Sequence, residues 1–377
     1  MQDYAGLSAK LIWDGTDEVR IPSEMGTPKE GQMVGTAGER LTELAGRVCY
    51  DSLGSGRPSG EYIQNILSVN HLSIAEHYTA TARLRGEMSP DLLISLLNRP
   101  WTWVNFDDKQ TIRITTNIRG VREWDAHSEK CAKESPLYPI VTAKTVGLVL
   151  RDLFHPLAPR IIEKPVHDQV WPMMRGLRIT ESAIVPPEHN SERWVTVYMV
   201  GSRGFSHELV RHGDWTAISQ RSTRYCEESE SPWVLHPLVQ EFLFNGQLAY
   251  DSRIDHLIDT SRQLYRDLVN ELVTFVTPRL KDDPYAKTSA RKQARGAARG
   301  FLGNALETEI IFSASVSQLL HILRMRAANA ADAEIRVMAC MLLGALKSSR
   351  YASEFSHLTL SGASDDLGQC LQDGGAK

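Results

Sequence analysis

The first strong pattern in the chain is helical and gives way to a strand. Residues 36–50 carry apolar side chains on one helical face, namely Leu41, Leu44, Ala45 and Val48. Residues 78–85 instead alternate between apolar side chains and Thr or Arg, which is the period of a strand with one buried face. The sequence therefore predicts a helix and then a half-buried strand, with another helix over 61–69 between them.

A second set of patterns lies beyond residue 190. The run WVTVYMV at 194–200 predicts a buried strand, and Ser202 is placed to cap a short helix after it. Residues 257–276 predict a long amphipathic helix, and 310–316 predict a strand followed by a helix that Ser317 can cap. Shorter patterns predict helices over 92–97, 142–154, 287–302 and 330–346, and a strand over 112–118. Strands interleaved with long helices indicate an α+β fold.

Three segments lack such periodicity. Residues 1–35 contain Gly and Pro and predict a loosely packed arm. Prolines cluster over 156–187, which indicates a connecting or lid-like region. Residues 361–377 are rich in Gly and Asp and predict a disordered tail.

Composition narrows the class of protein. The 377 residues are 42% hydrophobic and 23% charged, a globular balance, and the net charge of −4 argues against non-specific nucleic-acid binding. No apolar run reaches the roughly 18 residues needed to cross a bilayer, and the N-terminus lacks a signal-peptide pattern. We therefore expect a cytoplasmic protein with no membrane partner. The five cysteines are scattered without ligand spacing, which predicts neither a disulfide framework nor a metal site.

Chemistry-bearing residues are densest in RHGDWTAISQRSTRYCEE, residues 211–228. Its arginines can supply planar donors to a phosphate, and its hydroxyl residues can add donors at a turn. These residues are Arg211, Arg221, Arg224, Ser222 and Thr223. The alternative is a solvated polar loop, which composition alone favours.

A second group stands in HLSIAEH, residues 71–77, just before the predicted strand. His71, Ser73 and Glu76 can hydrogen-bond a cofactor. Two histidines and a glutamate can also bind zinc, although the spacing is not HExxH. A helix cap with satisfied histidines is the simpler interpretation.

Two basic features lie in the last third of the chain. Arg291, Arg295 and Arg299 share one helical face, which is either a solvated stripe or a wall of an anionic-substrate site. In SQLLHILRMR, residues 317–326, the polar side carries His321, whereas Arg326 falls on the apolar side. Buried arginines are rare unless paired, so Arg326 is a candidate for gripping a substrate acceptor, with a structural salt bridge as the alternative.

Taken in order, these residues resemble the flavin-dependent thymidylate synthases, whose motif is RHR, a seven-residue spacer and Ser. Here RHG stands at 211–213 and STRY at 222–225, with HELV before them. Other similar segments are AGRVCY at 45–50, HLSIAEH at 71–77, ARGFLGNALETE at 298–309 and SVSQLLHILRMRAANAADAEI at 315–335. The resemblance covers about 36–85 and 194–348.

That resemblance implies a fold and an assembly. It predicts a mixed sheet with long flanking helices over residues 36–360, interrupted by an insertion at about 87–190. It also implies a homotetramer whose active sites are shared between subunits.

The resemblance further implies roles for single residues. Its FAD contacts would be His71, Ser73, Arg211, His212, Gln220 and His321. Its nucleotide contacts would be Glu208, Ser222, Thr223, Arg224, Arg299 and Arg326, with Ser222 and Arg326 catalytic. Three of these depart from the usual residue, since Gln220, His321 and Glu208 stand where many members have Glu, Asn and Gln.

Two departures affect the motif itself. Gly213 replaces the last Arg, which removes a charged donor and frees the backbone, and the spacer has eight residues. A longer loop containing glycine beside the nucleotide would make room for a ribose 2′-hydroxyl. We therefore expect UMP as well as dUMP to be candidate substrates, as in members that look adapted to nucleoside-antibiotic pathways.

The implied reaction is FAD-dependent methylation of uridylate at C5, with methylenetetrahydrofolate and NADPH as co-substrates. Cysteine-dependent synthases use a PCxH context that this chain lacks, and Cys226 has no obvious base beside it. A cation such as Arg326 can instead stabilise enolate charge on the ring.

Two alternatives to this function stay open. One is a flavin-free nucleotide-binding protein on this scaffold, and the other is a nucleic-acid-binding module that uses the basic stripe.

Overall fold

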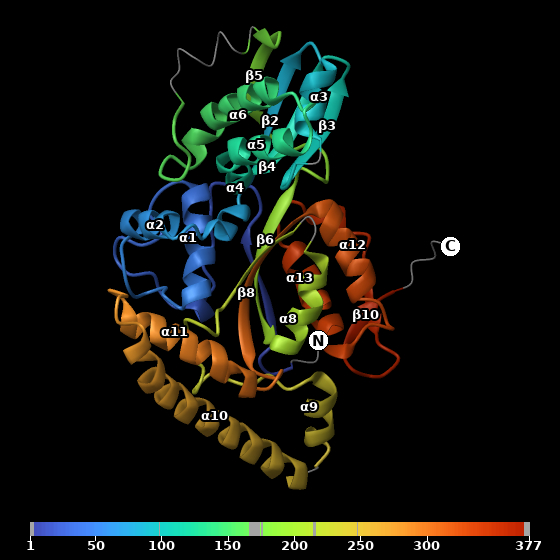
Figure 1. The fold of residues 1–377 in the computed structure, drawn as a ribbon. Coiled ribbons are helices and arrows are strands. Elements are labelled where there is room, and N and C mark those ends of the chain that lie inside the picture. The colour runs from blue at the N-terminus through green and yellow to red at the C-terminus, as the bar shows by residue number, and fades with distance from the viewer. Residues whose placement is uncertain are drawn as a thin grey trace.

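The computed structural model describes residues 4–97, 99–165, 174, 176–213, 216–246 and 248–372. It contains two four-stranded sheets, ordered β1-β6-β8-β7 and β3-β4-β2-β5, together with many helices (Figure 1). The α+β class is therefore confirmed. The expected mixed sheet is wrong, because every strand pair in the described part of these sheets is antiparallel. Alternating hydrophobicity shows which face of a strand is buried and says nothing of its direction.

The central sheet is covered on both faces (Figure 1). Its strands are β1 (Ser8–Trp13), β6 (Trp194–Ser202), β8 (Glu307–Ser315) and β7 (Thr216–Gln220). The covering helices are α1 (Ala37–Tyr50) on one face and α8 (Arg203–Leu209), α12 (Val316–Arg326) and α13 (Ala333–Leu346) on the other. Tyr198 of β6 packs in the core with α1, whereas its neighbour Val197 packs in the core with α12 and α13. Alternate residues of β6 thus serve two cores, which explains its unbroken apolar run.

The helix starts follow capping residues. Thr36 and Glu39 form a capping box at the start of α1, and α2 (Ser59–Ser68) follows as the sequence predicts. The Ser202 hydroxyl accepts a hydrogen bond from the Phe205 N–H, which confirms the predicted cap of α8. The predicted Ser317 cap is wrong, since Ser315 caps α12 directly where β8 ends.

The region expected as an insertion over about 87–190 forms, together with the strand before it, a lobe around the second sheet at the top of Figure 1, which we call the inserted lobe. Its strands are β2 (Thr79–Gly86), β3 (Thr102–Asp108), β4 (Thr111–Asn117) and β5 (Ile179–Val185). Its helices are α3 (Pro90–Leu96), α4 (Ile118–Arg122), α5 (Trp124–Glu134), α6 (Ile140–Phe154) and η3 (His155–Leu157). Ile112 and Ile114 of the sheet pack in one core with Leu150 and Phe154 of α6.

The proline-rich stretch is only partly as expected. β5 lies within it and pairs with β2, so the lid-like interpretation is wrong over residues 179–185. Prolines flank this strand and do not interrupt it. Residues 166–173 and 175 lie outside the described residues.

Both ends of the chain are more ordered than expected. The loose arm is wrong where β1 pairs with β6, because Ile12 and Trp13 are buried beneath α1. The disordered tail is wrong over residues 361–372, where β9 (Leu360–Gly362) pairs with β10 (Gln369–Leu371). Arg336 donates to Asp365 and fixes the loop between these strands. Residues 373–377 lie outside the described part of the chain.

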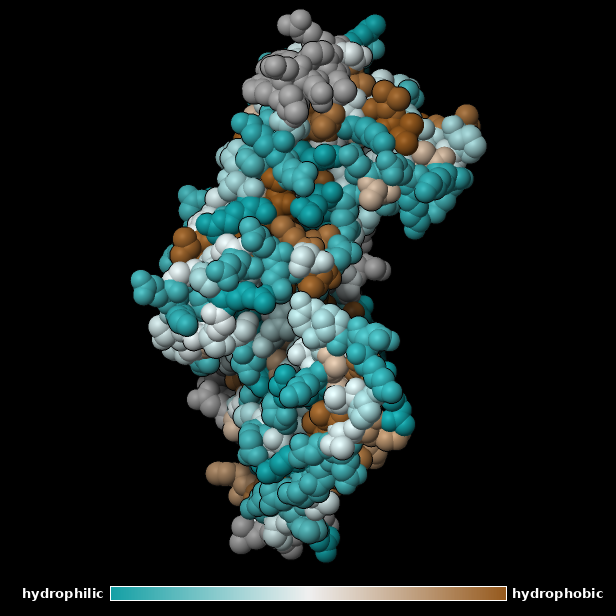
Figure 2. All heavy atoms as spheres, turned by 60° about the vertical axis from the view of Figure 1, so that its left-hand side comes forward, coloured by the Kyte–Doolittle hydropathy of each residue, from teal (hydrophilic) through white to brown (hydrophobic). Residues whose placement is uncertain are grey.

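A helical arm completes the molecule at the bottom of Figure 1. It consists of α9 (Pro237–Phe244), α10 (Leu248–Val276), η5 (Thr277–Arg279) and α11 (Ala286–Ala298), with η6 (Arg299–Phe301) after it. Tyr265 and Val269 of α10 pack in one small core with Ala294 and Ala298 of α11. Figure 2 shows a mostly hydrophilic surface with separate hydrophobic patches. Among the described residues, no helix has both the length and the apolar character to span a membrane.

Candidate functional site

The candidate residues gather at the two ends of one short strand. β7 is preceded by η4 (Val210–His212) and followed by the turn that begins at Arg221. Its five residues span roughly 15 Å at about 3.3 Å per residue. Within one chain the predicted ligands therefore fall into a group at the start of β7 and a group at its end.

The first group joins the motif to the late helix. The Arg326 guanidinium donates from Nε to His212 Nε2 over 2.8 Å and from Nη1 to Glu208 Oε2 over 3.0 Å. Its Nη2 makes no hydrogen bond to a described residue. The side chain of Arg326 is 19% exposed, so the arginine is partly buried and paired, as the salt-bridge alternative stated.

The electrostatics of this group favour a neutral histidine. Burial lowers the pKa of His212, and Arg326 and His321 lower it further. A neutral His212 can accept the hydrogen bond from Arg326 at Nε2. His321 is exposed on α12 and lies near enough to act electrostatically on His212.

The second group lines a pocket of about 250 Å³ at the other end of β7. His71 and Ser73 enter it from the η2 turn (Leu72–Glu76), and Gln220 and Ser222 enter from the strand and its turn. The aromatic ring of Tyr50 stands edge-on to both His71 and Tyr225. The pocket thus combines aromatic edges with hydroxyl and amide groups.

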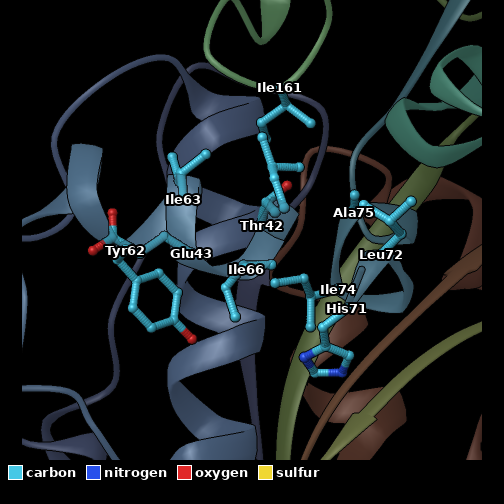
Figure 3. A pocket seen from close by; sticks show the side chains of 11 residues that line it. Thr42, Glu43, Tyr62, Ile63, Ile66, His71, Leu72, Ile74, Ala75 and Ile161 are labelled. Carbon is cyan, nitrogen blue, oxygen red and sulfur yellow. The ribbon is translucent and has the colours of Figure 1, made fainter. Parts of the chain in front are cut away.

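His71 is held by packing and by one hydrogen bond. Figure 3 shows its ring at the lower end of a small apolar pocket, below Ile74 and away from Ile161. That space is only about 10 Å³, about the room of one water, so it is too small for a ligand. His71 Nδ1 lies 3.0 Å from the Tyr50 hydroxyl. Burial lowers the pKa of His71 and raises the pKa of Tyr50 to about 12, so both are neutral near pH 7.

The turn after β7 is held by the basic stripe of α11. Arg299 Nη1 donates to Thr223 Oγ1 over 3.3 Å, and Arg295 donates to the Tyr225 carbonyl and to Glu227. The stripe therefore contacts the candidate site, although Arg291 is exposed. Arg211 and Arg224 are also exposed and have no described partner, so both are free to meet an anion.

Two side chains of the motif have other uses. Arg221, a candidate phosphate donor, is instead bound to Asp51 at 3.1 Å and to Glu309 at 3.1 Å, with Glu228 at 3.6 Å. That prediction is wrong, because three carboxylates, two of them from distant segments, surround the guanidinium. Burial raises the pKa of Cys226 to about 11, so its thiol is protonated at neutral pH and is a poor nucleophile.

The remaining residues of HLSIAEH have separate partners. His77 is fully buried, with Nδ1 2.8 Å from Ser313 Oγ and Nε2 2.9 Å from Ser219 Oγ. Glu76 accepts a hydrogen bond from Arg119. Because His71, Glu76 and His77 contact different partners, they do not converge on one metal position. His77 instead ties the η2 turn to β8 and β7.

His77 predicts a pH dependence of stability. Burial lowers its pKa to about 3 in the folded chain, whereas the unfolded value is about 6.5. The unfolded chain therefore binds more protons between these values, and stability falls as the pH drops from about 6.5 towards 3. The variant His77→Gln can contact both serines without titrating. Urea unfolding at pH 7.5 and pH 5 should show a larger acid loss for the wild type, and equal losses would contradict this assignment.

The family match falls on the same part of the chain. Residues 188–349, from the loop before β6 to the residues after α13, match the family described as thymidylate synthase complementing protein. This span contains His212, Ser222 and Arg326, so the match includes both groups of candidate residues along β7.

Several named proteins are similar in sequence to the same part of the chain. The flavin-dependent thymidylate synthases of Mycolicibacterium vanbaalenii and Corynebacterium diphtheriae are each 37% identical over 153 residues, and that of Mycobacterium tuberculosis is 35% identical. Through this region the chain is similar to the flavin-dependent thymidylate synthases. The aligned part is 40% of this chain and 56% of each relative, so the chain spans about half the length of the curated relatives it matches. His71 and Ser73 lie outside the residues matched by the family model, and their roles stay predictions.

Proposed function

We propose that the protein is an FAD-dependent enzyme that methylates C5 of a uridylate nucleotide, with methylenetetrahydrofolate and NADPH as co-substrates. The observation that carries this proposal is the contact of Arg326 with His212 and Glu208. It joins the arginine-rich motif to the late helix within the family-matched region. The names of the relatives support the same activity.

The residues of the chain supply electrostatic stabilisation. C5 of uracil is a poor nucleophile until charge develops on the ring oxygens, and a fixed cation stabilises that charge. Glu208 and His212 fix Arg326 at Nη1 and Nε, and Nη2 is the nitrogen that we assign to a ligand oxygen. A bound flavin would supply the redox chemistry. No cysteine nucleophile is required, in keeping with the raised pKa of Cys226.

The pocket of His71 fits part of a flavin. Its volume of about 250 Å³ lies just below the roughly 300 Å³ at which sites for drug-sized ligands begin. It can take an isoalloxazine or a pyrimidine ring, with Tyr50 and Tyr225 as aromatic walls and Ser73 and Gln220 as hydrogen-bonding groups. The whole of FAD does not fit there.

The separation of the two groups of candidate residues supports an active site that is shared between subunits. Ser222, Thr223, Arg224 and Arg299 lie at the end of β7, far from Arg326 at its start. One nucleotide cannot contact both groups of a single chain. We therefore infer a homotetramer in which the exposed Arg211 and Arg224 of one subunit face the groups of another.

An absorption spectrum of the purified protein, followed by assays with dUMP, methylenetetrahydrofolate and NADPH, tests this function. The expected results are flavin absorption bands and formation of dTMP. Light scattering should give four times the chain mass. A colourless protein that takes up no FAD on titration would overturn the proposal.

We also expect turnover of UMP. Gly213 has an ordinary right-handed helical backbone with φ −59°, so the glycine is not required by the conformation. Among the described residues, a Cβ at this position would meet the Val210 carbonyl, at 3.1 Å, and no other atom within 4 Å. The missing side chain therefore leaves room beside the motif for a ribose 2′-hydroxyl. Rates with UMP and dUMP should both exceed a no-enzyme control, and a UMP rate at background would contradict this expectation.

A further inference from the structure

The C-terminal hairpin, residues 359–372, lies beyond the residues matched by the family model and contacts the end of α12 that carries Arg326. Figure 1 shows its strand β10 beside α13. The N–H of Leu371 in β10 donates to the Ala327 carbonyl over 2.7 Å. Ala327 follows Arg326 directly and is fully buried. Because the last carbonyls of a helix have no partner within the helix, the hairpin supplies one at the residue next to Arg326.

A side chain of the α12–α13 loop, residues 327–332, makes a second link to the hairpin. Asn329 Nδ2 donates to Ser364 Oγ over 2.7 Å, and the Ser364 N–H donates to Asn329 Oδ1 over 2.8 Å. Both residues are exposed. Loss of the Asn329 side chain would therefore break two bonds between the loop and the hairpin without leaving a buried charge.

Arg336 of α13 joins the loop and the hairpin from the interior, where it is 1% exposed. Its Nη1 donates to the carbonyls of Asn329 and Ala331 over 3.0 and 2.9 Å. Its Nη2 donates to both carboxylate oxygens of Asp365, over 2.6 Å. One guanidinium thus connects the loop that follows Arg326 with the turn between β9 and β10.

The first turn of α13 also reaches the helix that carries the partner of Arg326. Glu334 accepts hydrogen bonds from the N–H and the hydroxyl of Ser202, over 3.0 and 2.8 Å. Ser202 caps α8, on which Glu208 lies. The loop and α13 therefore connect both helices whose side chains form the pair of Arg326 and Glu208. A misplacement of about 1 Å caused by a distant change can cost roughly a hundredfold in rate, so what holds this loop matters for the cation.

We propose that the C-terminal hairpin is a positioning element for Arg326, which acts through the α12–α13 loop with Asn329, Arg336 and Asp365 as positioning residues. The candidate FAD and nucleotide contacts lie outside the hairpin, so its effect on turnover would pass through Arg326. The assignment rests on the proposed function, because it gives the hairpin a task in that reaction.

A double-mutant cycle in the full-length, FAD-treated protein tests the assignment. Asn329→Ala should lower kcat with dUMP roughly tenfold while KM changes little, because Arg326 is assigned to the transition state. In the Arg326→Ala background the same replacement should have no further effect, whereas a general loss of folded protein would lower both rates by one factor. Asn329→Asp keeps an acceptor for Ser364 and should restore most of the rate. Melting temperatures check that each variant is folded.

Hydrogen exchange gives a readout that needs no turnover. The amides of residues 322–331 should exchange faster in Asn329→Ala, and also in Asp365→Ala, which removes the carboxylate from Arg336. The matched control is Gln372→Ala in the same hairpin, whose exposed side chain accepts a hydrogen bond from Thr359 before β9. This control should exchange and turn over as the wild type does.

Two results would overturn the assignment. One is unchanged exchange over residues 322–331 in both variants, and the other is an equal loss of kcat from Asn329→Ala with and without Arg326. Faster exchange in both variants of a protein that takes up no FAD and converts no dUMP would overturn the proposed function, while it would support the role of the hairpin in placing Arg326.

Discussion

Replacement of Arg326 by alanine is expected to lower uridylate turnover by roughly a hundred- to a thousandfold, the usual effect of removing one donor from a developing oxyanion. The guanidinium is fixed by His212 and Glu208, and Nη2 is the nitrogen left for the substrate. FAD should stay bound, because the proposed ring pocket at His71 has its own residues at the other end of β7. The rate with dUMP and the ratio of flavin to protein absorbance measure the two effects separately.

Arg324 provides the matched control on the same helix. It is exposed and lies two residues before Arg326, so Arg324→Ala should keep turnover within a few-fold of the wild type. Arg326→Lys keeps the charge but loses the planar fork, and an intermediate rate is expected. Near-normal turnover in Arg326→Ala would discard the role assigned to this residue.

Replacement of Arg113 by alanine is expected to destabilise the fold by about 3–5 kcal/mol, because it leaves a buried carboxylate without its counter-charge. Arg113 is 1% exposed and Glu192 is 3% exposed. The guanidinium donates to both carboxylate oxygens, over 2.8 to 3.0 Å. The pair joins β4 of the inserted lobe to the segment just before β6. Urea unfolding followed by circular dichroism measures the loss.

The pair also has a pH signature. Burial alone would raise the pKa of Glu192, but hydrogen bonds from Arg113 and from the backbone outweigh it and lower the pKa below the ordinary value. The stabilisation is therefore present above the unfolded pKa of about 4.3 and is lost as the pH falls through the lowered value. The exposed pair of Arg178 and Glu87 is the control, and Arg178→Ala should leave stability nearly unchanged. Equal losses from the two variants would contradict the importance of burial.

Sequence patterns located the elements that are long or strongly periodic. The helix that begins after Thr36 has a capping box and a regular apolar face, and its predicted limits agree with α1 within one residue. β1 was missed because its six residues stand among glycines and prolines, a window too short for periodicity to register. Tertiary pairing with β6 orders this segment, and neighbours in sequence say nothing of such pairing.

The same distinction applies to the site. Arg326 was identified because a charge on the apolar side of a helix requires a partner, and the structure supplies Glu208. Arg221 was misassigned because its partners Asp51 and Glu309 come from segments far away in the chain. A cleft of about 730 Å³ between the lobe and the start of β7 was missed for the same reason, since Trp101 and Trp194, which both line it, are far apart in the chain.

The inserted lobe leaves and rejoins the central sheet at neighbouring points. His77, just before the lobe, contacts Ser313, and Ser313 is paired with Thr196, two residues after β6 begins. Tyr78 lies against Trp13, which is also paired with Thr196. The segment over residues 78–193 therefore begins and ends at neighbouring positions on the central sheet. The length of this segment can therefore change without altering the register of β6 with β1 or with β8.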